Sequence, residues 1–343
     1  MLSAKQKGLV IAGLAGAAGL MFALTLGRPD PGSPVASSTP EPNIPTADVR
    51  TLVASPHLLF RHTAIDANYS HMGVAPVAEP NSQRGTSKLA CERVSFAAGR
   101  GICLQADRGV LTNYEAVLFD DQFEPRRSFK LDGRPSRTRV SPDGRLGAIT
   151  VFVSGQEHGY SSLSGFSTKT ILLDMASGDV LGDLETFKTL RDGTPFSAAD
   201  FNFWGVTFAR DSNSFYASLQ SAKKTYLVQG DVANRTLTVL HENVECPSLS
   251  PNNRLIAYKK RVGGDLAPWR FYLLDVATMT ERPLTAETRS IDDQIEWLDD
   301  ERVLFAMARS SQSAIQDVWV APIDGSAPAR PFLSQADSPI LVR

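Results

Sequence analysis

Short apolar runs alternate with polar turns along this chain from about residue 55 onward. The clearest example is "RVSPDGRLGAIT", residues 139–150, in which apolar-rich segments flank Pro142-Asp143-Gly144. Runs rich in Val, Ile, Leu, Phe and Thr, broken by Gly, Pro, Asn or Asp about every ten residues, predict short β-strands joined by turns. Few stretches show a helical period, so the pattern predicts an all-β domain.

The strand–turn–strand arrangement recurs along the chain. Its copies are "RTRVSPDGRLGAITVF", "WGVTFARDSNSFYASL", "CPSLSPNNRLIAYKK" and "QIEWLDDERVLFAMA". Aligned on the residue that ends the first strand, the copies are 68, 41 and 48 residues apart. A second pair of apolar runs, such as "TKTILLDMASGDVLGDL", follows each copy and makes four strands per unit.

Two less regular units precede these four. "CERVSFAAGRGICLQ" with "YEAVLFDDQFEPRRSFKL" has the same plan, whereas "HLLFRHT" and "HMGVAPV" fall short of a full unit. We expect the C-terminal "SPILVR" to supply the missing strand. Residues 51–343 number 293, or six units of about 49 residues, which suits the blades of a propeller. Because closing a ring of sheets buries their apolar faces, the repeats predict a six-bladed β-propeller over 51–343.

The segments "SPDGRLGAITVF" and "SPNNRLIAYKKR" resemble the repeats of TolB-type β-propellers. The run from "CERVSFAAGRGICL" to "DDQIEWLDDERVLFA" is similar to exported, single-propeller members of that family in high-GC Gram-positive bacteria. The resemblance covers residues 55–343 and implies the fold rather than an activity. In contrast to the periplasmic TolB protein, an apolar segment rather than an α/β domain precedes the propeller, so a role in Tol–Pal machinery is not carried over.

The N-terminal segment indicates a membrane anchor. Lys5 and Lys7 precede nineteen uncharged residues, Gly8–Leu26, enough to cross the hydrocarbon as a helix. The preceding basic residues favour an orientation with the propeller outside the cytoplasm. We therefore expect residues 1–27 to be a single-pass transmembrane helix and 28–50, rich in Pro and Ser, a disordered flexible linker. Secretion after signal cleavage is the alternative.

The cysteines fit an oxidising compartment. Cys91 and Cys103 flank "ERVSFAAGRGI", which reads as strand, turn and strand, so they are expected on neighbouring strands and to form a disulfide. Cys246 is left without a partner. The count of three and the absence of C-x-x-C argue against a zinc site.

Charge and motifs exclude several functions. Residues 51–343 carry 31 bases and 34 acids, without the clustered basic excess of a nucleic-acid-binding surface. The sequence contains no G-x-S-x-G, no H-E-x-x-H and no phosphate-binding Gly-x4-Gly-Lys. We therefore predict no nucleic-acid partner, no cofactor and no dedicated metal site.

Candidate binding residues follow from the expected geometry. Residues just before each innermost strand should ring one mouth of the central channel. These residues are found by counting back five or four positions from the residue that ends the first strand of each copy. They are Ser136, Arg137, Trp204, Glu245, Asp293 and Gln294. Such a ring suits a cation, a sugar or a peptide terminus, although wet channel mouths need polar residues anyway. The long segment 154–168 adds His158 as a candidate loop residue.

Three functional hypotheses remain open. The first is a membrane-tethered propeller outside the cytoplasm that binds another protein or an envelope polymer through one face of its ring. The second is a hydrolase or lactonase-like enzyme with a metal or acidic residues at the channel mouth. The third is the propeller half of a two-component peptidase. A metal held by Glu245 and Asp293 would favour the enzyme, whereas separated carboxylates beside an exposed apolar patch would favour binding.

Overall fold

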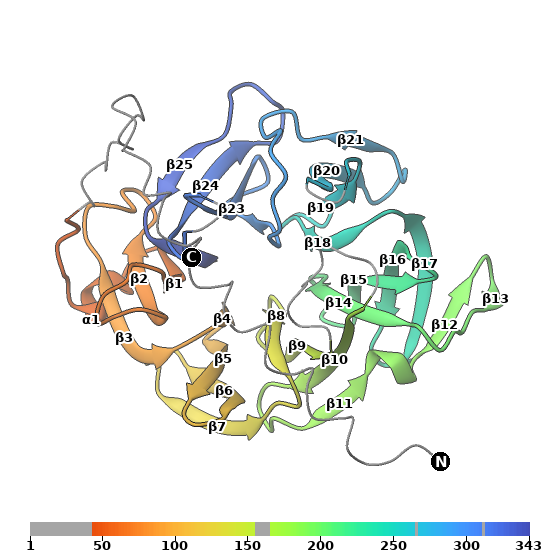
Figure 1. The fold of residues 1–343 in the computed structure, drawn as a ribbon, viewed down its shortest axis with the longest axis horizontal. Helices are drawn as coiled ribbons and strands as arrows, with labels where there is room; N and C mark the ends of the chain where they lie inside the picture. Colours follow the sequence, from red (N-terminus) through yellow and green to blue (C-terminus); the bar gives the residue numbers. More distant parts are fainter. Residues whose placement is uncertain (1–42, 155–164, 265–266, 311–312) are drawn as a thin grey trace, which may run out of the picture. The chain divides into compact units, whose positions relative to one another are not determined.

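The computed structural model describes residues 43–154, 165–264, 267–310 and 313–343. Residues Asn43–Arg343 form one compact unit, in which six largely antiparallel sheets surround a common centre (Figure 1). The all-β, six-bladed propeller expected from the repeats is thereby confirmed. The predicted anchor at 1–27, most of the predicted linker and His158 lie outside the described residues. Within the described ranges, no helix has the length and apolar character needed to cross a membrane.

The first three blades each contain four strands. From the innermost strand outward, blade 1 contains β26 (Ala336–Val342), β1 (His57–His62), β2 (His71–Pro76) and β3 (Gly85–Ala90). In the same order, blade 2 contains β4 (Arg93–Ala97), β5 (Arg100–Arg108), β6 (Thr112–Asp120) and β7 (Pro125–Lys130). Blade 3 contains β8 (Arg134–Val140), β9 (Leu146–Ser154), β10 (Ser167–Asp174) and β11 (Val180–Asp183).

Blade 4 is wider than the others. It contains β14 (Asn202–Phe208), β15 (Ser214–Ser221), β16 (Lys224–Asp231) and β17 (Thr236–Glu242), extended outward by β12 (Lys188–Arg191) and β13 (Thr194–Pro195). Blade 5 contains β18 (Glu245–Leu249), β19 (Leu255–Arg261), β20 (Trp269–Asp275) and β21 (Glu281–Pro283). Blade 6 contains β22 (Glu296–Trp297), β23 (Arg302–Ala308), β24 (Gln316–Pro322) and β25 (Arg330–Leu333).

The long spacing of 68 residues between the first two copies of the repeat has a structural cause. A 3₁₀ helix (Leu184–Thr186) and the ribbon β12–β13 lie between blades 3 and 4. β12 pairs in parallel with the outermost strand β17, so the ribbon projects from the rim of the ring (Figure 1). The extra residues therefore widen one blade and leave the six-fold ring intact.

The two ends of the folded unit meet in blade 1. β26, which contains the C-terminal segment expected to complete the ring, pairs antiparallel with β1, with Leu58 opposite Leu341 and Leu59 opposite Ile340. Residues 43–50, expected to end the linker, belong to the same unit. The Ala47 N–H donates to the carbonyl of Arg84, and Asp48 caps the short helix α1 (Val49–Leu52).

The repeated turn has one hydrogen-bond pattern in two blades. In blade 3 the Ser141 hydroxyl donates to Asp143 and accepts the Leu146 N–H at 2.9 Å, while Gly144 takes φ +71°. In blade 5 the Ser250 hydroxyl donates to Asn252 in the same way, and Asn253 takes φ +61°. The turn needs side-chain oxygens, which Ser and then Asp or Asn supply. It also needs a residue in the left-handed conformation, which Gly or Asn adopts most readily.

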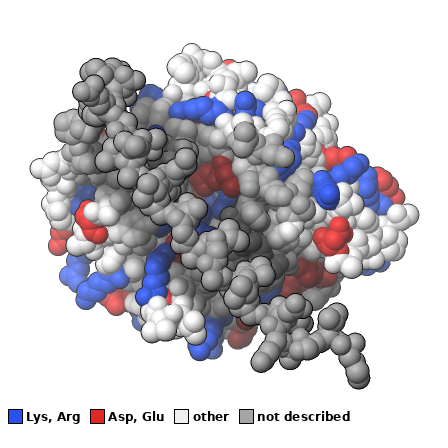
Figure 2. Space-filling view, viewed as in Figure 1, with Lys and Arg blue, Asp and Glu red and all other residues white. Residues whose placement is uncertain are grey.

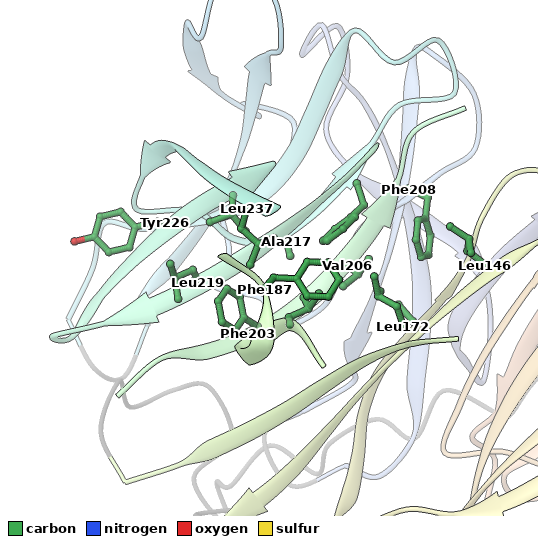
Figure 3. Close-up of a cluster of buried hydrophobic side chains, with 14 residues drawn as sticks. Leu146, Leu172, Phe187, Phe203, Val206, Phe208, Ala217, Leu219, Tyr226 and Leu237 are labelled. Atoms are coloured by element: carbon green, nitrogen blue, oxygen red, sulfur yellow. The ribbon is translucent and has the colours of Figure 1, made fainter. Parts of the chain in front are cut away.

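Neighbouring blades pack through apolar side chains. In the largest described cluster, Leu146 and Leu172 of blade 3 lie beside Val206 and Phe208 of blade 4 (Figure 3). Hydroxyl groups add hydrogen bonds between the innermost strands, as where Thr207 accepts the N–H of Leu249 at 3.1 Å. Burial of these faces is the main force that holds the ring together.

Strand direction gives the ring two distinct faces. Each innermost strand begins at one face, called the start face, which also carries the connections between the second and third strands of each blade. Each innermost strand ends at the opposite face, called the turn face, which carries the repeated turns such as 141–145 and 250–254.

Candidate functional site

Charged side chains from four blades meet at the start face. Arg93 begins β4, Arg137 lies in β8, Lys259 lies in β19 and Asp292 precedes β22. The Asp292 carboxylate accepts a hydrogen bond from the Lys259 Nζ and lies 3.6 Å from Arg137 Nη2. The Lys259 side chain is 0% exposed and that of Asp292 is 40% exposed. The carboxylate therefore lies between a buried ammonium and the open mouth of the channel.

The two neighbouring aspartates differ in their electrostatic surroundings. Burial acts against the charge of Asp292, but Lys259 and Arg137 together hold the pKa of its carboxyl below the ordinary value. Burial also acts against the charge of Lys259, yet Asp292 raises the pKa of that ammonium. Asp293 accepts the Ala306 N–H at 2.8 Å, and burial raises the pKa of its carboxyl. Asp292 thus holds its charge more firmly than Asp293.

A second ionic group adjoins the first where the ring closes. Arg61 donates from Nη1 to Asp337 at 2.7 Å, which ties β1 to β26. Arg93 lies 4.0 Å from the same carboxylate and donates from Nε to the carbonyl of Ser136 at 2.9 Å. The Asp337 Oδ1 is buried without a hydrogen-bond partner among the described residues. Arg93 therefore connects blades 1, 2 and 3 at the channel mouth.

Glu245 is neutralised inside the protein rather than presented at the mouth. Its side chain is 0% exposed and accepts a hydrogen bond from Arg261 Nε at 3.0 Å. Burial raises the pKa of the Glu245 carboxyl. The Trp269 ring covers both nearby cations, with its centroid 4.3 Å from Lys259 Nζ and 5.1 Å from the Arg261 guanidinium carbon. This carboxylate is therefore committed to the chain's own cations.

Two further sequence candidates are also buried. Trp204 is 0% exposed and meets Phe166 edge-on, with ring centroids 5.7 Å apart, in a cluster that includes Cys246. Ser136 is 2% exposed. Neither side chain is presented at the rim of the mouth, so neither forms part of a ring of exposed groups.

Three candidates do come together. Arg137, Asp293 and Gln294 line a cavity of about 30 Å³ within the channel, next to Arg93. The Gln294 side-chain amide donates to the carbonyl of Pro247 at 3.1 Å, which links blades 5 and 6. A space of this size suits a water molecule or two rather than an organic ligand.

Bulges explain why counting back the same number of residues in each repeat selects side chains that are buried to different extents. The pairing of β14 with β15 shifts between Trp204 and Thr207, and that of β18 with β19 shifts after Glu245. Cys246 within the second bulge has φ +50°. Because a bulge inserts one unpaired residue, it reverses which side chains face the channel beyond it. Counting back along an ideal strand cannot register that change.

The remaining candidates concern sulfur and metal chemistry. Cys91 and Cys103 form a disulfide with their Cα atoms 5.2 Å apart, which confirms the expected pairing, and Cys246 is a buried free thiol. Over the described part of the chain, no group of three or more His, Cys, Asp or Glu residues is placed to hold a metal ion.

The sequence reasoning missed the residues that dominate the mouth. Arg61, Lys259 and Asp337 lie on β1, β19 and β26, and none of them was among the candidate binding residues. One signal was available, since Lys259 follows the apolar stretch "LIAY", in which Ile256, Ala257 and Tyr258 are buried. A buried lysine needs an anionic partner, which in this protein is the partly exposed Asp292.

Exposed apolar side chains surround this charged mouth. The large apolar residues that the structure exposes at the start face, on connections or at the end of β9, are Ile65 (77%), Tyr69 (36%), Val110 (106%), Leu111 (78%), Val153 (41%) and Val262 (50%). The other exposed large apolar residues in the described ranges are Val180 and Leu181, on the outer strand β11. On the face drawn in Figure 2, basic and acidic side chains are interspersed among uncharged ones. The start face thus combines apolar loops with a self-neutralised polar centre.

Comparisons with known proteins identify the fold. No family model matches the sequence, and no curated protein matches it. Among solved structures, TolB from Acinetobacter baumannii aligns with a TM-score of 0.57 at 17% identity, covering 83% of this chain and 66% of that one. A chain of the nidogen/laminin complex aligns with a TM-score of 0.55 at 12% identity, covering 82% of this chain and 96% of that one.

A putative TolB from Agrobacterium tumefaciens gives a TM-score of 0.48 at 14% identity, covering 83% of this chain and 91% of that one, which is too weak to argue from. The described unit is a six-bladed β-propeller similar in structure to the TolB propeller, and it spans just under two thirds of the A. baumannii TolB chain. Likeness at this level of identity shows the fold and leaves activity and partners to the site itself.

Proposed function

We propose that this chain is a propeller held outside the cytoplasm by an N-terminal membrane anchor, and that it binds another protein of the cell envelope through its start face. The supporting observation is that the exposed large apolar side chains lie at the start face of four blades, apart from a pair on β11. Apolar side chains exposed on several loops of one face provide surface that a protein partner can bury.

The chemistry of the channel mouth supports binding over catalysis. Glu245 is bound by Arg261, and Asp292 is bound by Lys259, so these carboxylates already have cationic partners. The enzyme hypothesis requires Glu245 and Asp293 to converge on a metal or substrate, but Glu245 is fully buried and Asp293 accepts the Ala306 N–H. The fold also has a precedent in the nidogen/laminin complex, where a similar chain belongs to a protein assembly.

Affinity capture tests the proposal. The full chain, with its N-terminal segment intact, is recovered from solubilised membranes after mild cross-linking, and companions are identified by mass spectrometry. The variant V110D/L111D places two charges on one start-face hairpin. The matched control V180D/L181D places the same charges on the exposed outer strand β11.

We expect one companion to be captured by the parent chain and by the control, and to be lost from V110D/L111D. Because both pairs of side chains are exposed, neither variant should unfold, and thermal melting verifies this. Equal capture by both variants would place the contact elsewhere, and absence of any specific companion across several growth conditions would overturn the proposal.

A further inference from the structure

The turn face carries a second, larger cavity on the channel axis. It has a volume of about 390 Å³ and lies at the opposite end of the channel from the charged mouth. The ends of all six innermost strands or the turns that follow them contribute to its wall: Ala98, Val140, Arg210, Pro251, Trp297 and Leu341. Its volume falls within the range of pockets that hold small organic ligands.

The charged groups of this cavity favour an anion. Arg139 donates from Nη1 to Glu296 and from Nη2 to the carbonyl of Ile295, while its Nε is buried without a hydrogen-bond partner among the described residues. Arg210 lines the same cavity, and no ion pair joins its guanidinium to any residue in the described ranges. Arg343 also lines this wall, where its guanidinium donates to the carbonyl of Leu298 at 2.8 Å and offsets the carboxylate of the same terminal residue. After Arg139 and Glu296 likewise neutralise each other, the positive charge of Arg210 remains.

Hydroxyl groups add donors to the same wall. The Ser95 hydroxyl accepts the Val140 N–H at 2.9 Å, and the Thr207 hydroxyl accepts the Leu249 N–H at 3.1 Å. Each accepting oxygen keeps its own proton for donation. The wall between these polar groups is apolar and includes Trp297. The cavity therefore offers several donors, a cationic group and apolar surface to one occupant.

We propose that the turn-face cavity binds a carboxylate attached to an apolar group, with Arg210 contacting the carboxylate. A guanidinium presents a planar pair of N–H donors that matches the two oxygens of a carboxylate. The donor-rich wall disfavours a cation, and the apolar wall favours a ligand with a hydrophobic body. Two sources share this chemistry, namely a small organic acid and the free C-terminus of a peptide with an apolar last residue.

Calorimetric titration of the full chain tests this inference. The probes are 3-phenylpropanoate and its amide, and a pentapeptide ending in phenylalanine with a free or an amidated C-terminus. Arg210→Gln removes the charge of an exposed side chain. Arg254→Gln is the matched control, because Arg254 is exposed on the turn of blade 5 and does not line the cavity.

We expect a carboxylate probe to bind the parent chain and Arg254→Gln alike, and Arg210→Gln to bind it about tenfold or more weakly. Each amide should bind the parent chain no more tightly than the corresponding carboxylate binds Arg210→Gln. Preference for the phenylpropanoate or for the free peptide would identify the source. Equal binding of acid and amide, unchanged binding by Arg210→Gln, or no binding of either carboxylate at millimolar concentration would overturn the inference.

The V110D/L111D variant separates this inference from the proposed function. Its charges lie on the start face, so carboxylate binding at the turn face should persist even where capture of the protein partner is lost. Loss of carboxylate binding in that variant would show that the two ends of the channel are not independent.

Discussion

A side chain at Gly101 is expected to cost stability, because an aromatic ring fills the space above this glycine. Gly101 in β5 lies directly opposite Phe119 in β6, and a Cβ built on Gly101 would lie 2.0 Å from the Phe119 Cζ. The Phe119 ring is 2% exposed, stacks on Phe96 at 5.9 Å and meets Phe123 edge-on at 6.1 Å. These neighbours leave the ring no free direction in which to move.

We expect Gly101→Ala to lower the free energy of unfolding by about 2 kcal/mol. Overpacking of a close-packed core costs up to about 3 kcal/mol. Because glycine is disfavoured inside a strand, replacing it by alanine offsets up to about 1 kcal/mol of the overpacking cost. Gly109→Ala is the control from the same hairpin, where the nearest atom would lie at an ordinary 3.8 Å, so its effect should stay within about 0.5 kcal/mol.

Urea unfolding, followed by tryptophan fluorescence, measures these differences. A double variant, G101A/F119L, tests the cause, because the smaller leucine gives way to the new methyl group. Its loss should be smaller than the sum of the two single losses by about 1 kcal/mol or more. Additive losses, or a Gly101→Ala variant as stable as the parent, would refute the reasoning. The same cross-strand pairing joins Gly73 to Phe60 and Gly230 to Phe215.

Two further predictions concern charge. Asp292→Asn removes the counter-charge of the buried Lys259 and should lower the free energy of unfolding in urea by about 2 kcal/mol. This is less than for a fully buried pair, because Asp292 is 40% exposed. Asp132→Asn, which breaks the surface pair with Lys169, should lower it by under about 1 kcal/mol. Equal costs would contradict the assigned pairing. Burial lowers the pKa of His57 and of His62, so the unfolded chain takes up protons more readily than the folded one as the pH falls below 6.5. The free energy of unfolding should therefore fall between about pH 6.5 and pH 5. A H57Q/H62Q variant should lose less stability over that interval, and an unchanged pH slope would argue against this origin.

The sequence predicted the blades well because their determinants are local. Ser141, Asp143 and Gly144 form a turn from their own side chains and backbone, and Ser250 with Asn252 repeats it, so the pattern is readable without knowledge of distant contacts. The pairing of Cys91 with Cys103 was also local, since only the short strand β4 and one turn separate Cys91, which precedes β4, from Cys103 in β5.

The channel mouth was harder to predict because its contacts join distant residues. Arg61 meets Asp337 across 276 residues, and Lys259 meets Asp292 across a blade boundary. No periodicity places such partners, and a bulge beside Cys246 shifts the strand register that any count along the chain must assume. The apolar residues of the start face are likewise recognisable only once the strand directions are known.

The pairing of β26 with β1 also constrains how this chain can mature. β1 is among the first strands to emerge during synthesis, yet the partner that covers its inner edge, residues Ala336–Val342, is among the last. Until then β1 presents open backbone donors and acceptors to any strand that it meets. A chaperone that shields the early blades would therefore assist folding, and a truncation that removes β26 should make the domain aggregate.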